Sequence, residues 1–255
     1  MNESGTSPRP HDRITTVDAS AVAEPSVVGP GTDGPTTGEA HGPLAPLVPH
    51  LRGWLHAIMA PIAVVCGIVL VAFSPSEYRG AAALYSATAI LLFGTSAVYH
   101  RFSWSPRTKV TLKRLDHSNI FLIIAGSYTP FAVVLLPPDQ ARTLLLLVWG
   151  GALAGVLFRV FWVGAPRWLY TPIYIALGWV ALFYLPAFWA EGGAAVVILL
   201  AAGGLFYSAG GVVYALKRPN PSPTWFGFHE VFHALTLLGF ITQYVAVSLV
   251  LYGAS

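Results

Sequence analysis

Residues 54–73 read WLHAIMAPIAVVCGIVLVAF and contain no Asp, Glu, Lys or Arg. A helix of this length rises about 30 Å, which matches the thickness of the hydrocarbon core of a lipid bilayer. The stretch therefore predicts a membrane-spanning helix.

Further apolar segments of similar length follow, near 81–100, 115–136, 143–163, 169–189, 194–216 and 226–251. Short connections with turn-forming residues separate the segments, among them Ser74-Pro75-Ser76, Pro137-Pro138-Asp139, Glu191-Gly192-Gly193 and Pro219-Asn220-Pro221. Helices are favoured because an open sheet would leave backbone groups unpaired in lipid, and a barrel would show alternating strands of about ten residues. The sequence thus predicts an all-α fold, an integral membrane bundle of seven transmembrane helices over residues 49–255.

Composition supports this fold class, since 55% of the 255 residues are apolar and only 10% are charged, against about a quarter in soluble domains. The net charge is +3, but the basic residues are scattered rather than gathered in one stripe, so we expect no nucleic-acid partner. The single cysteine, Cys66, excludes an intrachain disulfide and a cysteine-based metal site. The oligomeric state is not determined by the sequence.

The first 48 residues differ from the rest, because they are rich in Pro, Gly, Ser, Thr and Ala and contain no aromatic residue. This composition predicts a disordered tail. The segment also lacks the basic start and apolar stretch of a secretory signal, so we expect it to be retained.

The distribution of Lys and Arg predicts the orientation, because positive charge is retained on the cytoplasmic side. With the N-terminus inside, the outer segments hold only Arg79 and Arg142. We therefore expect a multi-pass protein of the plasma membrane, with a cytoplasmic N-terminus and an extracytoplasmic C-terminus. The other twelve of the 14 basic residues lie in inner segments: Arg9, Arg13, Arg52, Arg101, Arg107, Lys109, Lys113, Arg114, Arg159, Arg167, Lys217 and Arg218.

Ionisable residues inside spans are costly and become candidate site residues by default. His100 ends the second predicted span, Asp116 begins the third, and His229 and His233 begin the seventh. These span ends face the same side in the predicted topology, so the four side chains share one membrane depth. Each has a plainer explanation on its own, such as a histidine among headgroups or an acid at a helix N-terminus.

Two of these histidines have metal-chelating spacing, since residues four apart lie on one face of a helix. His229-Glu230-Val231-Phe232-His233 also fits the H-E-x-x-H pattern, in which the glutamate serves as general base. With His100 as third ligand, a tetrahedral zinc would keep one position for water. Asp116 would orient or deprotonate that water. Ser96, one turn before His100 on the same helix face, is the second candidate catalytic residue and would hydrogen-bond to a ligand or to Asp116.

Three further polar residues are interpreted as lying outside the site. His117 points about 100° away from Asp116 on a helix, which suits a supporting residue better than a ligand. Arg159 is expected to extend to the inner headgroups. We keep His56, in the first predicted span, out of the site.

These residues carry a resemblance to a known family. The blocks Ser96-Ala97-Val98-Tyr99-His100, 115–120 (LDHSNI), 125–131 (AGSYTPF) and 229–233 (HEVFH) resemble the haemolysin III family, the bacterial branch of the progestin and adipoQ receptor group. The resemblance implies a seven-helix bundle with zinc near the cytoplasmic face, held by His100, His229 and His233, with Ser96 and Asp116 beside it. Alkaline ceramidases are similar in this set, which implies zinc-dependent hydrolysis of a lipid amide or ester; the family pattern does not require Glu230.

Several functions compete at this point. A hydrolase that acts on a lipid-like substrate from within the membrane needs an open zinc position and a cavity that lipid can enter. A receptor-like or regulatory protein would use a closed, structural zinc, with Asp116 as a direct ligand. We discount a pore-forming toxin, because the apolar spans describe a resident membrane protein, and ion transport, because the outer half of every span is nearly free of charge.

Overall fold

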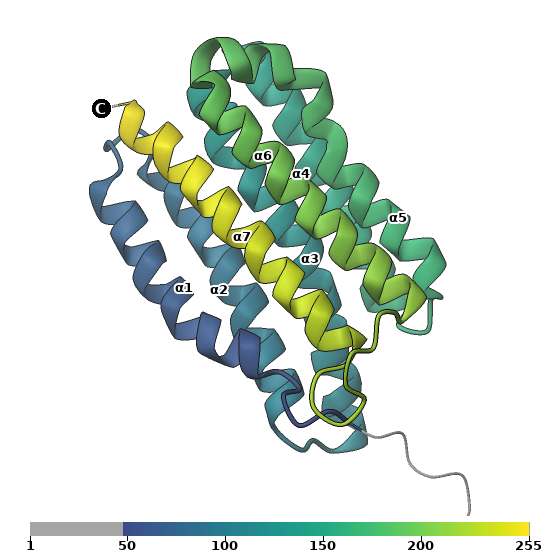
Figure 1. Ribbon diagram of the computed structural model, residues 1–255. Helices are drawn as coiled ribbons and strands as arrows, with labels where there is room; N and C mark the ends of the chain where they lie inside the picture. Colours follow the sequence, from purple (N-terminus) through teal and green to yellow (C-terminus); the bar gives the residue numbers. More distant parts are fainter. Residues whose placement is uncertain (1–47, 255) are drawn as a thin grey trace, which may run out of the picture. The chain divides into compact units, whose positions relative to one another are not determined.

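A computed structural model describes residues 48–254 of the chain. The predicted tail, including Arg9 and Arg13, lies outside these residues except for its last position. The elements in chain order are α1 (Trp54–Phe73), α2 (Arg79–Arg101), α3 (Pro106–Leu135), α4 (Pro138–Phe161), α5 (Arg167–Gly178), the 3-10 helix η1 (Trp179–Tyr184), α6 (Leu185–Leu216) and α7 (Phe228–Gly253). Figure 1 shows the helices running side by side, so the prediction of an all-α fold is confirmed.

Six helices within residues 48–254 are long and apolar enough to cross a membrane. The predicted count of seven is therefore matched in part, because α5, η1 and α6 form one continuous helical stretch, Arg167–Leu216. Gly193 interrupts α6 with φ 75° and ψ 175°, a conformation that residues with a side chain rarely adopt. Figure 1 shows this stretch turning back on itself between the label α5 and the label α6.

The third helix begins well before the predicted apolar segment at residue 115. Ser105 caps it, since its Oγ accepts a hydrogen bond from the Thr108 N–H at 3.3 Å, and Pro106 occupies the first helical position. The polar turns that follow are helical but not apolar. Hydropathy detects only the lipid-sized part of a helix, so this extension was missed.

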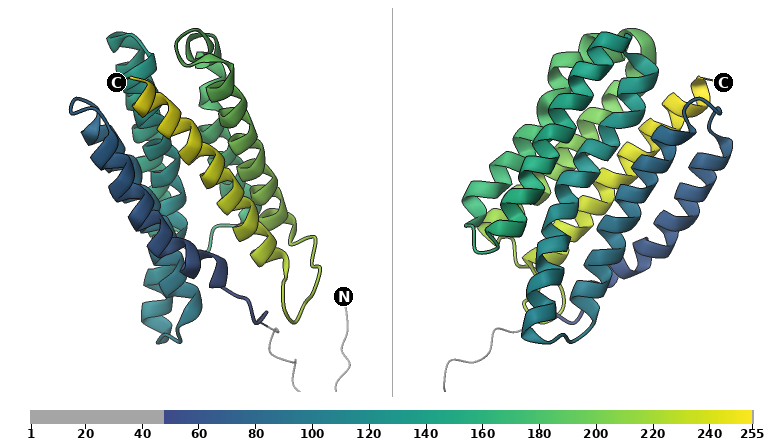
Figure 2. Two further views of the ribbon diagram at one scale, coloured as in Figure 1. Left: turned by 60° about the vertical axis from the view of Figure 1, so that its left-hand side comes forward. Right: turned by 180° about the vertical axis from the view of Figure 1, so that it is seen from behind.

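Helices that follow one another in the chain pack together in the pairs α1–α2, α2–α3, α3–α4 and α6–α7. Helix α7 also contacts α1 and α3, and Figure 2 shows it crossing diagonally between the α1–α2 pair and α6. Helix α3 is the most buried of the six candidate spans, with 67% of its most apolar window inside the bundle. Side chains near the starts of α3 and α7 and the end of α2 therefore face a shared interior.

The outer surface is apolar while polar residues lie inside. Ile58, Val65 and Ile68 on α1 are 57–64% exposed, whereas Arg159 and Glu230 are 1% exposed. Water would not tolerate such extended apolar surface, but lipid does. Together with the six apolar helices, this distribution identifies a multi-pass membrane protein.

Candidate metal centre

The start of α7 is fixed by hydrogen bonds to its free backbone N–H groups. The Gly227 N–H donates to Glu230 Oε2 at 2.8 Å, and the Phe228 N–H donates to Asn220 Oδ1 at 3.0 Å. These contacts satisfy donors that every helix N-terminus leaves open. They hold the first turns of α7, which carry His229 and His233, in a defined position.

Glu230 has partners on both of its carboxylate oxygens, and neither partner is a histidine. Oε1 pairs with Arg52 Nε at 2.5 Å, and Oε2 accepts from the Gly227 backbone. The segment before α1 is held there because the His50 and Leu51 N–H groups donate to the connection that precedes α7. The H-E-x-x-H pattern assigns Glu230 as a general base. In the structure, its carboxylate instead links the start of α7 to the segment before α1 through the ion pair with Arg52.

Asp116 is placed by a contact between α3 and α2. One turn after it, Asn119 Nδ2 donates to the Leu91 carbonyl at 2.9 Å and to Thr95 Oγ1 at 3.0 Å. This buried pair of hydrogen bonds fixes the rotation of α3 against α2. As a result Asp116 Oδ2 lies 3.9 Å from His100 Nε2.

The three predicted metal ligands converge in space. One ring nitrogen each from His100, His229 and His233 lies within 4.8 Å of the other two, and His100 Nε2 and His229 Nε2 are 3.2 Å apart. A tetrahedral zinc with bonds of about 2.0–2.1 Å to nitrogen would hold neighbouring nitrogens about 3.3–3.4 Å apart. The donor set and this spacing therefore fit a zinc ion.

His56 belongs to this cluster, although from the sequence it was interpreted as lying outside the site. Its ring stacks on that of His233 with centroids 3.8 Å apart, and its Nδ1 is 2.8 Å from Ser96 Oγ. Ser96 was expected to hydrogen-bond with a ligand or with Asp116, and its hydroxyl contacts Asp116 as well as His56. The signal was present in the sequence, because a histidine inside a span is a candidate by default.

Two other residues lie near the cluster without joining it. His117 has partners on both ring nitrogens, the Lys113 carbonyl at 2.9 Å and Tyr214 OH at 3.0 Å, as suits a supporting residue. Arg159 was expected to reach the headgroups, but it is 1% exposed and its guanidinium lies over the Tyr170 ring at 4.3 Å. The prediction for Arg159 is wrong because α5 covers the last turns of α4.

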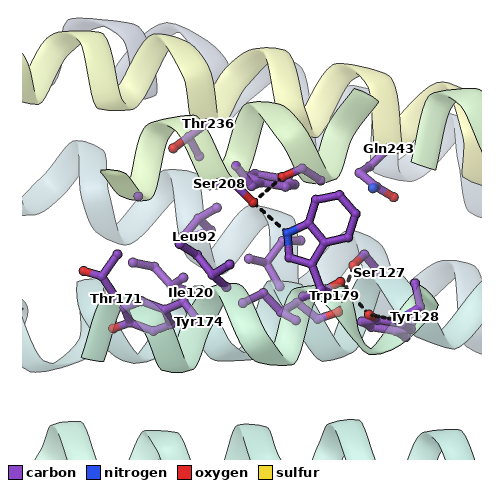
Figure 3. A pocket seen from close by; sticks show the side chains of 18 of the residues that line it. Leu92, Ile120, Ser127, Tyr128, Thr171, Tyr174, Trp179, Ser208, Thr236 and Gln243 are labelled. Carbon is purple, nitrogen blue, oxygen red and sulfur yellow. Dashed lines mark hydrogen bonds between the residues drawn. The ribbon is translucent and has the colours of Figure 1, made fainter. Parts of the chain in front are cut away.

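An apolar cavity extends from the histidine cluster into the bundle. Its polar end is formed by His56, Ser96, Asp116, His229 and His233, and the rest is lined largely by apolar and aromatic side chains of α3, α5, α6 and α7. Figure 3 shows part of this lining, which mixes apolar side chains with polar ones such as Thr236 and Gln243; the indole of Trp179 projects among them and donates to Ser208 Oγ at 2.8 Å. A cavity of this kind suits an elongated apolar ligand.

Comparison with known proteins finds similarity to one family. A family model described as haemolysin-III related matches residues 47–244, a range that includes the whole histidine cluster. The chain is 32% identical over 146 residues to the Hemolysin-3 homolog of Bacillus subtilis (strain 168), covering 57% of this chain and 68% of that relative. It is 27% identical over 196 residues to Hemolysin-3 of Bacillus cereus, covering 75% of this chain and 86% of the relative.

Proposed function

The chain belongs to the haemolysin-III-related family, and from this premise we propose that it is a zinc-binding membrane hydrolase of a lipid amide or ester. Membership confirms the resemblance inferred from the four sequence blocks. One observation carries the proposal: ring nitrogens of His100, His229 and His233 converge within 4.8 Å, and two of these residues, His229 and His233, line a largely apolar cavity. Three imidazoles favour zinc over the harder cations.

The residues around the cluster have separable tasks in such a reaction. Zinc, when bound, polarises a carbonyl and makes a neighbouring water more acidic. The attacking water must lose a proton, and Asp116 Oδ2, 3.9 Å from His100 Nε2, is the base placed to take it. The same carboxyl group can return the proton to the leaving amine or alcohol, so that one water is consumed and one acid is released.

The cavity supports a lipid-like substrate. Its lining combines His229 and His233 with many apolar side chains of α3, α5, α6 and α7, so an acyl chain that lay there could bring its carbonyl to the histidines. Ser96 is held by His56 at 2.8 Å, which orients its hydroxyl beside the polar end and makes it a positioning residue.

We also propose seven crossings in the plasma membrane, with the N-terminus in the cytoplasm. The Arg167–Leu216 stretch has 50 residues, well over the roughly 20 that one crossing needs. The break at Gly193 supports two crossings within it. The excess of Lys and Arg at the histidine end supports the orientation.

The first test measures bound metal in protein purified in detergent without a histidine tag, by elemental mass spectrometry. We expect about one zinc per chain, lost when His229→Ala is combined with His233→Ala. The matched control is His50→Ala, an exposed histidine outside the cluster, which should keep the metal. A folded wild type without metal, or a double variant that retains it, contradicts the zinc assignment.

A second candidate is a receptor-like protein with structural zinc, in which Asp116 would be the fourth ligand; its Oδ2 lies 3.9 Å from one of the three histidines, at His100 Nε2. Asp116→Asn separates the two functions. In a hydrolase the variant keeps its zinc and loses about 10²-fold or more of its cleavage of fluorescent N-acyl and ester lipids. Loss of the zinc, together with wild-type protein that cleaves no lipid, supports the structural role.

A further inference from the structure

A second cavity, of about 330 Å³, lies beside the histidine cluster and is lined by basic side chains. Its volume is many times the roughly 30 Å³ that one water occupies. Arg52, Lys113, Arg159 and Arg167 line it, while its described lining contains no Asp or Glu. We refer to it as the basic cavity.

Most of this positive charge has no counter-charge. Arg52 is paired with Glu230. Within residues 48–254, Lys113, Arg159 and Arg167 form no ion pair with a carboxylate. Three cations from α3, α4 and α5 therefore face one cavity without an anion.

Arg159 is the clearest case, because it is 1% exposed and lines the basic cavity instead of extending to the outer surface. Its guanidinium rests on the Tyr170 ring, and one nitrogen donates to the Trp162 carbonyl at 3.4 Å. Its Nε is buried and has no hydrogen-bond partner among the residues that the structure describes. A buried charge with an unused donor is costly unless a ligand completes it.

Arg167 is held in place rather than extended into solvent. It donates to the Tyr214 carbonyl at 3.1 Å, and its guanidinium lies 4.3 Å from the centre of the Tyr214 ring. Stacking on an aromatic ring leaves other N–H groups of a guanidinium free for an anion. The cavity is thus preorganised for a ligand that accepts several charge-assisted hydrogen bonds.

We propose that the basic cavity binds a phosphate group. Two guanidinium forks and an ammonium group match the several oxygens and the double charge of a phosphate better than the single charge of a carboxylate. Basic pockets between membrane helices bind phosphorylated headgroups by the same chemistry. Two of the proposed zinc ligands, His100 and His229, also line the basic cavity, so phosphate binding has to be tested separately from metal binding.

The source of the phosphate is a lipid headgroup or a soluble phosphate. The two cavities share His117, Tyr170, Tyr214 and His229 as lining residues. A lipid whose acyl chain occupied the apolar cavity would therefore place its headgroup in the basic cavity, with the histidine cluster between them.

The test is a calorimetric titration of the full chain in a maltoside detergent, which carries no phosphate, with dioctanoyl phosphatidic acid and, separately, with inorganic phosphate. We expect Lys113→Gln and Arg167→Gln to weaken binding tenfold or more. Lys109→Gln is the matched control, since Lys109 is exposed one turn from Lys113 and does not line the cavity. Binding of phosphatidic acid alone identifies a lipid headgroup, and binding of inorganic phosphate at similar concentrations identifies a soluble ligand.

Two results would overturn the proposal: folded wild type that binds neither ligand, or Lys109→Gln that weakens binding as much as Lys113→Gln. Loss of the buried charge of Arg159 can prevent folding, so the decisive variant is at Lys113, which is partly exposed. Thermal unfolding of each variant is recorded to show that it is folded. His233→Ala removes a proposed zinc ligand that does not line the basic cavity. It should lose zinc and keep phosphate binding; loss of both would assign the phosphate to the metal site.

Discussion

Glu230 lies between the two histidines of α7 in the sequence, yet its carboxylate stabilises the fold. Its oxygens accept from the Arg52 guanidinium and from the Gly227 N–H. Glu230→Gln keeps an acceptor for the backbone but removes the charge opposite Arg52. We expect a loss of about 1–3 kcal/mol in stability, since a charged group loses its buried partner, while zinc content stays unchanged.

Thermal unfolding in detergent and elemental analysis measure both effects of Glu230→Gln. Glu191→Gln, at an exposed position, should leave both quantities as in the wild type. If Glu230→Gln instead leaves stability intact and abolishes lipid cleavage, then Glu230 acts as the base that the H-E-x-x-H pattern assigns to it.

At the scale of elements, the approach of α1 to α2 depends on Gly53, which precedes α1. Its φ is 78°, and a Cβ added there would lie 2.6 Å from His100 Cβ. Gly53→Ala therefore combines a left-handed backbone, which costs about 1–2 kcal/mol, with displacement of His100. We expect a lower melting temperature and faster removal of zinc by a chelator.

Gly80→Ala is the control for this contact, because a Cβ at Gly80 in α2 meets nothing within 4 Å in the described structure. Its melting temperature and zinc release should match or exceed those of the wild type, as alanine favours helix. Equal rates of zinc release from Gly53→Ala and Gly80→Ala would show that zinc binding by His100 does not depend on the close approach of α1.

At the scale of the whole molecule, the number of crossings decides on which side the chain ends. Seven crossings place the termini on opposite sides of the membrane, and six place them on the same side. A reporter phosphatase that is active only outside the cytoplasm, fused after Ala254, is expected to be active. The same reporter fused after Arg218, in the connection between α6 and α7, is expected to be inactive; activity at Arg218 and none at Ala254 would reverse the orientation.

The sequence by itself determined the apolar helices and the pairing of His229 with His233. Both are local properties, since transfer into lipid depends on the composition of a short stretch, and residues four apart share a helix face whatever surrounds them. The shared level of His100 and Asp116 also followed, because a chain of spans alternates its ends between two sides.

Only the tertiary structure decided which polar groups meet. Arg52 and Glu230 are 178 residues apart, and their pairing needs α1 and α7 to be neighbours. His56 joins the cluster because α1 packs against α7, and Arg159 is buried because α5 covers it. Hydropathy and spacing describe one helix at a time, whereas these contacts depend on the neighbour and rotation of each helix, which packing across the whole bundle selects.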